Sequence, residues 1–316
     1  MTPVKEELKI FSGTSHPDLT KKIADHLGAK VSEITLSRFS GGEIYARIKE
    51  NVRGQNCVVV QTCTQNVNDN YMELFIIIDA LKRASVKSIN AVIPQFGYAR
   101  QDRKAASREP ISARLVANLL ETAGADRIST MDLHSDQIQG FFNIPMDTLT
   151  FTPIFVNYLK SKNLKDPIVV APDVGRAKVA KKLADKLGAE LAILHKVRAK
   201  HHESDVTHIV GDVKGRTVII TDDMIDTAGT ATTGVNALKK EGCNPDIYMV
   251  ATHGIFSGPA IERIEKAGFT EVVVSDSLPI PKEKQFKALK VISCAELLGE
   301  AIKRNYENLS ISSLFD

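Results

Sequence analysis

The chain repeats itself. The segment KKIADHLGA at residues 21–29 recurs almost unchanged as KKLADKLGA at residues 181–189, which is 160 positions later. The same spacing relates VVVQT at 58–62 to VIITD at 218–222, and ALKRAS at Ala80 matches ALKKEG at Ala237 with a slightly smaller offset. Several matches at nearly constant spacing indicate two related halves. We therefore expect one domain over residues 1–148 and a second over residues 149–316.

Each half alternates short apolar runs with amphipathic stretches. NCVVVQT and RTVIITDD are typical of buried strands, whereas SARLVANLLETAGA and AKVAKKLADKLGA carry the periodicity of helices. Near-continuous apolar strands separated by helices favour a parallel sheet that is covered on both faces. We predict an α/β fold of two similar domains, each with a mostly parallel sheet flanked by helices. In such sheets, ligands bind beyond the carboxyl ends of the strands.

The composition excludes several classes of protein. Among 316 residues, 41 lysines and arginines stand against 38 aspartates and glutamates, so the net charge of +3 does not predict a nucleic-acid partner. The four cysteines lack the spacing of a zinc site or a disulfide framework, which favours a reducing cytoplasm. The N-terminal segment lacks the pattern of a secretory signal, and no apolar run is long enough to span a membrane.

The segment TDDMIDTAGTATTG at residues 221–234 carries the clearest chemistry. Asp222 and Asp223 end a predicted strand, Asp226 adds a third acid, and a tight loop at 227–230 leads into the next helix. Carboxylates accept hydrogen bonds from hydroxyls, while backbone N–H groups at a helix N-terminus bind anions. A helix cap alone requires only one such side chain. The pattern therefore predicts a sugar phosphate, and the matching first-half segment, QTCTQNVNDN, lacks it.

This loop resembles the phosphoribosyl pyrophosphate loop of type I phosphoribosyltransferases and of phosphoribosyl pyrophosphate synthetases. FGYARQDRK, SREPISARL, MDLHSDQIQGFFNIP and THGIFSGPA resemble the class I synthetase, ribose-phosphate diphosphokinase, and the resemblance extends over residues 9–315. It implies a duplicated phosphoribosyltransferase-like fold. It also implies pyrophosphoryl transfer from ATP to the 1-hydroxyl of ribose 5-phosphate, giving phosphoribosyl pyrophosphate and AMP for nucleotide biosynthesis.

The resemblance also assigns roles to individual residues. It implies ATP contacts, with the 39–43 loop reaching a neighbouring subunit, for Phe39, Gly41, Gly42, Glu43, Arg100 and Gln101. It implies ribose 5-phosphate contacts for Arg198, Asp222, Asp223, Asp226, Thr227, Ala228, Gly229 and Thr230. It implies that Lys196 and Arg198 are the catalytic cations that close over the triphosphate, and that His134 and Asp173 are the Mg²⁺ ligands.

A regulated assembly is implied as well. Members of this family form homohexamers of dimers, activated by phosphate and inhibited by nucleoside diphosphates. Ser310 and Ser312 are candidates for the allosteric site. From the residues alone, His134 is a lone histidine of a kind that is more often structural. His195, His201, His202 and His208 lie in a charged segment without helical ligand spacing, so they do not predict a transition-metal site.

Four positions depart from the family pattern. Gly41 replaces an aspartate in the ATP loop, and Arg176 in PDVGRAK replaces the second glycine of Pro-Asp-x-Gly-Gly. Ala228 lies in the phosphate loop, where its N–H group still serves, and Ser313 replaces an aromatic residue in the tail. Two alternatives follow, a weakly active or inactive regulatory homologue and, in another reaction class, a phosphoribosyltransferase.

Overall fold

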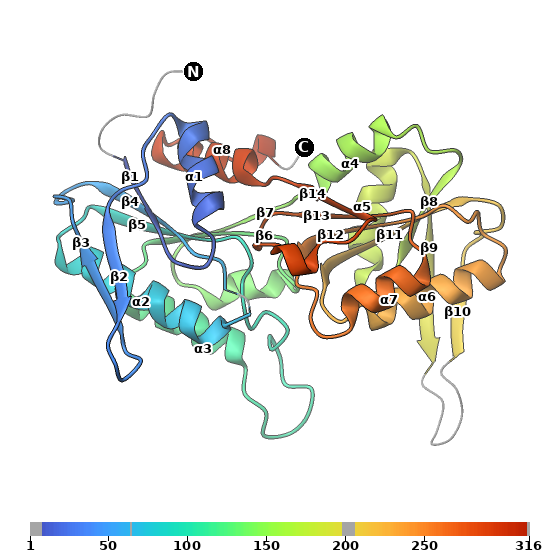
Figure 1. The fold of residues 1–316 in the computed structure, drawn as a ribbon, viewed down its shortest axis with the longest axis horizontal. Helices are drawn as coiled ribbons and strands as arrows, with labels where there is room; N and C mark the ends of the chain where they lie inside the picture. The colour runs from blue at the N-terminus through green and yellow to red at the C-terminus, as the bar shows by residue number, and fades with distance from the viewer. Residues whose placement is uncertain (1–7, 64, 198–205, 315–316) are drawn as a thin grey trace. The chain divides into compact units, whose positions relative to one another are not determined.

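The computed structural model describes residues 8–63, 65–197 and 206–314. The chain divides into two compact units. Unit 1 comprises Met1–Thr150, Ser277–Pro279 and Ser293–Asp316, and unit 2 comprises Phe151–Asp276 and Ile280–Ile292. Each unit contains one main sheet with helices on both faces (Figure 1). The predicted fold class is therefore confirmed.

Unit 1 is built on a five-stranded, fully parallel sheet. Its strands, in spatial order, are β1 (Leu8–Ser12), β4 (Asn56–Val60), β5 (Ser88–Ile93), β6 (Arg127–Met131) and β7 (Met146–Leu149). One face carries α1 (Pro17–Leu27) and α8 (Ala295–Tyr306), and the other carries α2 (Val67–Arg83) and α3 (Ser112–Ala123) (Figure 1). An antiparallel hairpin, β2 (Ile34–Arg38) and β3 (Ile44–Ile48), packs along α2. A 3₁₀ turn, η1 (Asp136–Phe141), follows β6, and η4 (Ser312–Leu314) follows α8.

Unit 2 is built on a seven-stranded sheet that is parallel apart from one edge pair. Its spatial order is β10 (Val206–Val210), β9 (Glu190–Val197), β8 (Pro167–Ala171), β11 (Thr217–Ile225), β12 (Ile247–Gly254), β13 (Glu271–Ser275) and β14 (Leu289–Ile292). Helices α4 (Thr152–Ser161) and α5 (Ala177–Leu187) cover one face, and α6 (Gly229–Lys240) and α7 (Ala260–Ala267) cover the other (Figure 1). Two 3₁₀ turns, η2 (Val174–Arg176) and η3 (Lys282–Lys284), lie in connections.

The duplication read from the sequence is also a duplication of topology. The order β1-β4-β5-β6-β7 in unit 1 recurs as β8-β11-β12-β13-β14 in unit 2. A hairpin follows the helix that comes after the first strand of each unit, β2–β3 after α1 and β9–β10 after α5. The repeated sequence ends α1 and α5 in the same way, because Gly28 and Gly188 both adopt left-handed backbone angles (φ 64° and 68°) that glycine tolerates.

The division of the chain differs from the expected domains at the C-terminal end. The first boundary falls at Thr150, near the expected position 148, whereas residues 293–316 join unit 1 and not the second domain. The reason is that α8 packs against α1. Gly299 permits this approach, since a Cβ atom there would lie only 2.6 Å from Cδ2 of His26. Among the described residues, no helix is long and apolar enough to cross a membrane.

Candidate active site

The acid pair lies at the carboxyl end of the central strand of unit 2. β11 pairs in parallel with β8 as far as Ile220 and with β12 as far as Ile225, so β12 flanks the end that carries the acids. Asp223 is 3% exposed and Asp222 is 23% exposed. The backbone N–H of Asp223 donates to Oδ1 of Asp222 over 2.8 Å. Burial, together with the charge of Asp223, raises the pKa of Asp222 well above its usual range, and Arg176 opposes the rise.

The phosphate loop follows directly. Residues 226–228 connect β11 to α6, whose first residues are Gly229 and Thr230, and the backbone of Ala228 adopts a left-handed conformation at φ 58° just before the helix begins. The first N–H groups of any helix lack intrahelical acceptors, which makes this N-terminus suited to an anion. Arg263 of α7 donates from Nη1 to the carbonyl of Thr227 over 3.0 Å and approaches Gly229. The loop therefore has a cation beside it.

Asp173 and Arg176 form the adjacent turn after β8. The Asp173 side chain is exposed and accepts the backbone N–H of Arg176 over 3.0 Å, which caps η2. The Arg176 guanidinium reaches the acid pair, with Nε 3.3 Å from Oδ1 of Asp222 and Nη2 3.7 Å from Oδ1 of Asp223. Nε finds no hydrogen-bond acceptor among the described residues, so its contact with Asp222 is an ion pair without hydrogen-bond alignment.

One of the two predicted catalytic cations, Lys196, lies in the edge hairpin of unit 2. Lys196 is near the end of β9, where its backbone pairs with Thr207 of β10. Arg198 falls outside the residues that the structure describes. Unit 2 thus brings together Asp173, Asp222, Asp223 and the 226–230 loop at one sheet edge.

The predicted ATP residues lie in unit 1. The turn of the β2–β3 hairpin is closed by the N–H of Phe39 donating to Glu43 and that of Gly42 donating to Phe39, at 2.9 and 2.8 Å. All of the turn is exposed, and the Phe39 side chain is 56% exposed. A Cβ atom on Gly41 would meet no atom within 4 Å, so the fold does not require glycine at this position.

Arg100, Gln101 and His134 follow the neighbouring strands β5 and β6, and all three are exposed. Oε1 of Gln101 accepts the hydroxyl of Ser112 over 2.5 Å, which ties this loop to the start of α3. Since β5 and β6 are parallel neighbours, the three residues share the carboxyl edge of one sheet. The second predicted metal ligand, Asp173, belongs to unit 2.

The tail serines lie beside Arg304. Its Nη1 donates to the carbonyl of Ser310 over 2.9 Å and to the hydroxyl of Ser313 over 2.7 Å. The hydroxyl of Ser310 donates to that of Ser312 over 3.1 Å. The two candidate allosteric serines are therefore adjacent, with an arginine next to them.

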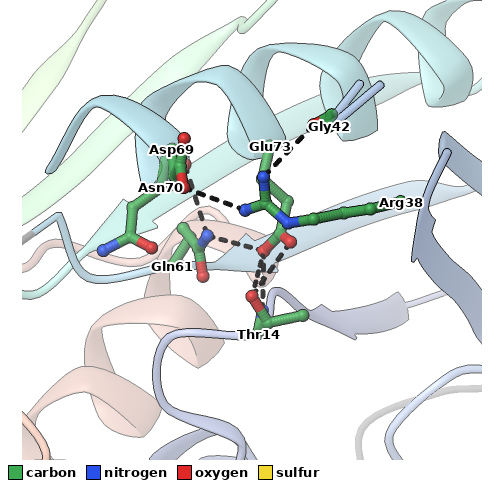
Figure 2. Close-up of polar contacts among 7 residues, drawn as sticks. All are labelled: Thr14, Arg38, Gly42, Gln61, Asp69, Asn70 and Glu73. Carbon is green, nitrogen blue, oxygen red and sulfur yellow. Dashed lines mark hydrogen bonds and ion pairs between the residues drawn. The ribbon is translucent and has the colours of Figure 1, made fainter. Parts of the chain in front are cut away.

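Unit 1 contains a polar cavity of about 230 Å³ at the carboxyl ends of β1 and β4. Thr14, which lines the cavity, contacts the buried carboxylate of Glu73. That carboxylate accepts the N–H and hydroxyl of Thr14 and the amide of Gln61, all within 2.9 Å (Figure 2). Arg38 lies above and pairs with Asp69 over 3.1 Å (Figure 2). The residues that line the cavity are Thr14, Ser15, Arg38, Thr62, Gln65, Asn66, Asp69, Asn70 and Pro279.

Sequence reasoning missed three of these features. The ion pairs of Arg176 were signalled only by its departure from the family pattern. The contact between Arg263 and the phosphate loop spans 36 residues and leaves no local signal. The unit 1 cavity was concealed because its polar residues come from four separate segments.

Comparisons with known proteins cover nearly the whole chain. Residues 8–124 match the family model described as the N-terminal domain of ribose phosphate pyrophosphokinase, and residues 197–316 match the phosphoribosyl synthetase-associated domain. A ribose-phosphate pyrophosphokinase of Bacillus subtilis (strain 168) is 50% identical over 310 residues, covering 98% of each chain. That of Bacillus caldolyticus is 50% identical over 316 residues, covering both chains fully.

A solved structure agrees with these relatives. The crystal structure of phosphoribosylpyrophosphate synthetase from Mycobacterium smegmatis matches with a TM-score of 0.91 and 46% identity, covering 96% of this chain and 100% of that one.

Proposed function

The chain belongs to the ribose-phosphate pyrophosphokinase family, and on this premise we propose how its residues carry out the reaction. The reaction transfers the pyrophosphoryl group of ATP to the 1-hydroxyl of ribose 5-phosphate. The products are phosphoribosyl pyrophosphate, used in nucleotide biosynthesis, and AMP.

Ribose 5-phosphate binds at the carboxyl edge of the unit 2 sheet. Asp222 and Asp223 accept hydrogen bonds from the ribose hydroxyls. The 5-phosphate is held by Asp226, Thr227, Ala228, Gly229 and Thr230 through backbone N–H groups and hydroxyls at the α6 N-terminus. The observation that carries this proposal is the acid pair beside that N-terminus, since the two features complement opposite ends of one sugar phosphate.

ATP binds to loops of unit 1. Arg100 and Gln101 contact the nucleotide, while the hairpin residues Phe39, Gly41, Gly42 and Glu43 reach the ATP site of a neighbouring subunit. The exposure of the Phe39 ring supports this role, because a large apolar side chain in solvent is suited to stacking on a base from another subunit. This role requires at least two subunits, and we propose the homohexamer built from dimers that the family resemblance implies.

In the reaction, the 1-hydroxyl oxygen forms a bond to the β-phosphorus of ATP. The bond from that phosphorus to the oxygen bridging the α-phosphate breaks, AMP leaves, and the hydroxyl proton passes to solvent. Lys196 and Arg198 offset the negative charge that is redistributed over the phosphates. Catalysis is chiefly positioning and neutralisation of charge.

The family uses a divalent metal, and we propose that it is Mg²⁺. Among the described residues there is no group of three or more potential ligands, so an all-protein metal cage does not fit. The proposed ligands are His134 and Asp173. Each side chain is exposed, and few protein ligands are needed for Mg²⁺, which keeps several waters and binds substrate phosphates. When bound, the ion would supply positive charge that offsets the negative charge of the ATP phosphates.

Regulation and location complete the proposal. Ser310 and Ser312 form part of an allosteric phosphate or nucleoside diphosphate site, supported by the nearby Arg304 guanidinium. The protein works in the cytoplasm, where its four cysteines, all free thiols, remain reduced.

An AMP-release assay with ATP, Mg²⁺ and ribose 5-phosphate tests the function. We expect AMP to form in proportion to phosphoribosyl pyrophosphate. Lys196→Ala should lower kcat about 100-fold or more, as expected for loss of a charge-stabilising group, whereas Lys240→Ala at the far end of α6 should leave it unchanged. Wild-type AMP release no faster than that of Lys196→Ala would reject the synthetase. The alternatives would then be a regulatory homologue or, if the protein consumes added phosphoribosyl pyrophosphate together with a base, a phosphoribosyltransferase.

A further inference from the structure

Arg176 lies beside the proposed sugar site of unit 2 but has no role in the proposed reaction. It replaces a small residue of the family pattern, and its guanidinium lies within ion-pair distance of both carboxylates assigned to the sugar, at 3.3 Å and 3.7 Å. The side chain is only 14% exposed. The arginine therefore belongs to the substrate pocket.

The fold fixes the backbone position of Arg176. Asp173 accepts the backbone N–H of Arg176 and caps η2, so the α-carbon is held at the carboxyl end of β8. β8 pairs in parallel with β11, which carries the acid pair at its own carboxyl end. Adjacent parallel strands end at the same edge of a sheet, so Arg176 and the acids are neighbours by topology.

The charges explain what the arginine contributes. The pocket places two adjacent carboxylates, one of them 3% exposed, beside the loop that receives a phosphate. Without a cation, the carboxylates would repel each other and the incoming anion. Arginine keeps its charge at any accessible pH. Its Nε makes an ion pair with Asp222 without an aligned hydrogen bond, so it offsets charge without saturating that carboxylate as an acceptor.

We propose that Arg176 is a specificity-determining positioning residue, a built-in counter-ion that holds Asp222 and Asp223 in place to accept hydrogen bonds from the ribose hydroxyls. The inference rests on the proposed ribose 5-phosphate site and adds the residue that sets its preference for the sugar hydroxyls. Acting through the carboxylates, Arg176 favours ribose 5-phosphate over a sugar phosphate that lacks the 2-hydroxyl.

Calorimetric titration without nucleotide provides the test. Ribose 5-phosphate and 2-deoxyribose 5-phosphate are titrated into the wild type, Arg176→Met and Arg176→Lys, all in EDTA so that no metal replaces the guanidinium charge. We expect Arg176→Met to bind ribose 5-phosphate about tenfold more weakly, as for loss of a charge-assisted contact. It should also lose most of the wild-type discrimination against the deoxy sugar. Arg176→Lys, which keeps the charge, should recover part of both.

The outcomes separate the inference from the function. If the wild type binds ribose 5-phosphate and Arg176→Met binds it as tightly or more tightly, with unchanged discrimination, the counter-ion role is wrong and the arginine only occupies space. If the wild type binds neither sugar, the proposed site itself fails. Circular dichroism melts of the three proteins establish that each is folded, and the discrimination ratio would not change through a general loss of stability.

Discussion

The two halves share a strand order but differ in the residues and connections at the carboxyl ends of their matching strands, β4 and β11. In unit 2, Asp222 and Asp223 lie near the end of β11, which stops at Ile225, and a short loop leads into α6. In unit 1, β4 ends at Val60, before Gln61 and Thr62, and α2 begins at Val67. Aligned on ALKRAS and ALKKEG, α2 begins 13 residues before Ala80, whereas α6 begins only eight residues before Ala237. The extra helical turn of α2 therefore takes the place of the phosphate loop.

Because of this extra turn, unit 1 places a carboxylate of its own where we propose that unit 2 binds the phosphate of a ligand. In the same alignment, Glu73 of α2 matches Thr230 of the phosphate loop. The Glu73 carboxylate is 4% exposed and accepts the N–H and hydroxyl of Thr14 and the amide of Gln61. Unit 1 thus satisfies these donors with its own carboxylate, whereas we propose that the phosphate of the ligand occupies the corresponding place in unit 2. A duplicated pocket can become part of the structure when the protein supplies the missing charge.

The largest effect is expected at Glu73. Glu73→Ala removes a buried carboxylate and leaves the N–H of Thr14 and the amide of Gln61 without their acceptor. We expect a loss of about 3 kcal/mol in the free energy of unfolding, measured by urea denaturation. Ribose 5-phosphate affinity of the folded protein should not change. The exposed Glu265→Ala serves as the control and should change stability by less than about 0.5 kcal/mol. A Glu73→Ala protein that keeps its stability but binds ribose 5-phosphate more weakly would contradict this account, since it would place the sugar in unit 1 and not in unit 2.

The next effect is expected at the matched strand ends. Asp222→Asn should weaken ribose 5-phosphate binding about tenfold or more, since it replaces a charged hydrogen-bond acceptor with a neutral one. Thr62→Val, at the aligned position of unit 1, should leave the affinity unchanged. Equilibrium dialysis with labelled ribose 5-phosphate compares the two variants directly. Equal affinities for Asp222→Asn and the wild type would remove the acid pair from the sugar site.

The acid pair also gives unit 2 a pH dependence. The folded-state pKa of Asp222 is raised, so the folded protein holds the proton more tightly than the unfolded chain does. As pH rises from the ordinary aspartate pKa, about 4, ionisation of Asp222 therefore costs stability until its raised pKa is passed. As pH rises through this window, the urea midpoint of unfolding should fall for the wild type relative to that of Asp222→Asn, which has no carboxyl group to ionise. A gap that stays constant with pH would mean that burial does not perturb Asp222.

The smallest effect is expected in the phosphate loop. Ala228 has φ 58°, a conformation that costs an L-residue about 1 kcal/mol. Glycine avoids this strain, but its greater conformational entropy in the unfolded chain offsets part of the gain in stability. Ala228→Gly should therefore stabilise the protein by about 0.5 kcal/mol. Ala231→Gly, inside α6, should destabilise it by about 1 kcal/mol. Thermal unfolding of the two variants should shift in opposite directions, and a shift in the same direction would place no strain at Ala228.

Sequence patterns revealed the parts of this molecule that depend on local chemistry. The repeated KKxADxLGA segment predicted two α/β halves, because periodicity and a terminal glycine define a helix wherever it occurs. The acids and threonines of residues 221–234 predicted a sugar-phosphate site for the same reason. The docking of α8 on α1 depends on the small volume of Gly299 beside His26, which no local pattern encodes. The pairing of Arg176 with the acids likewise depends on β8 and β11 being neighbours.

A crystal structure with ribose 5-phosphate soaked into the protein in the absence of nucleotide tests the contrast between the two pockets most directly. We expect the sugar hydroxyls within hydrogen-bond distance of Asp222 and Asp223, and the 5-phosphate on the N–H groups of residues 228–230. The cavity beside Thr14 and Glu73 should hold no sugar phosphate. Ribose 5-phosphate bound in that unit 1 cavity, with the acid pair still in contact only with protein, would contradict the assignment of the substrate to unit 2.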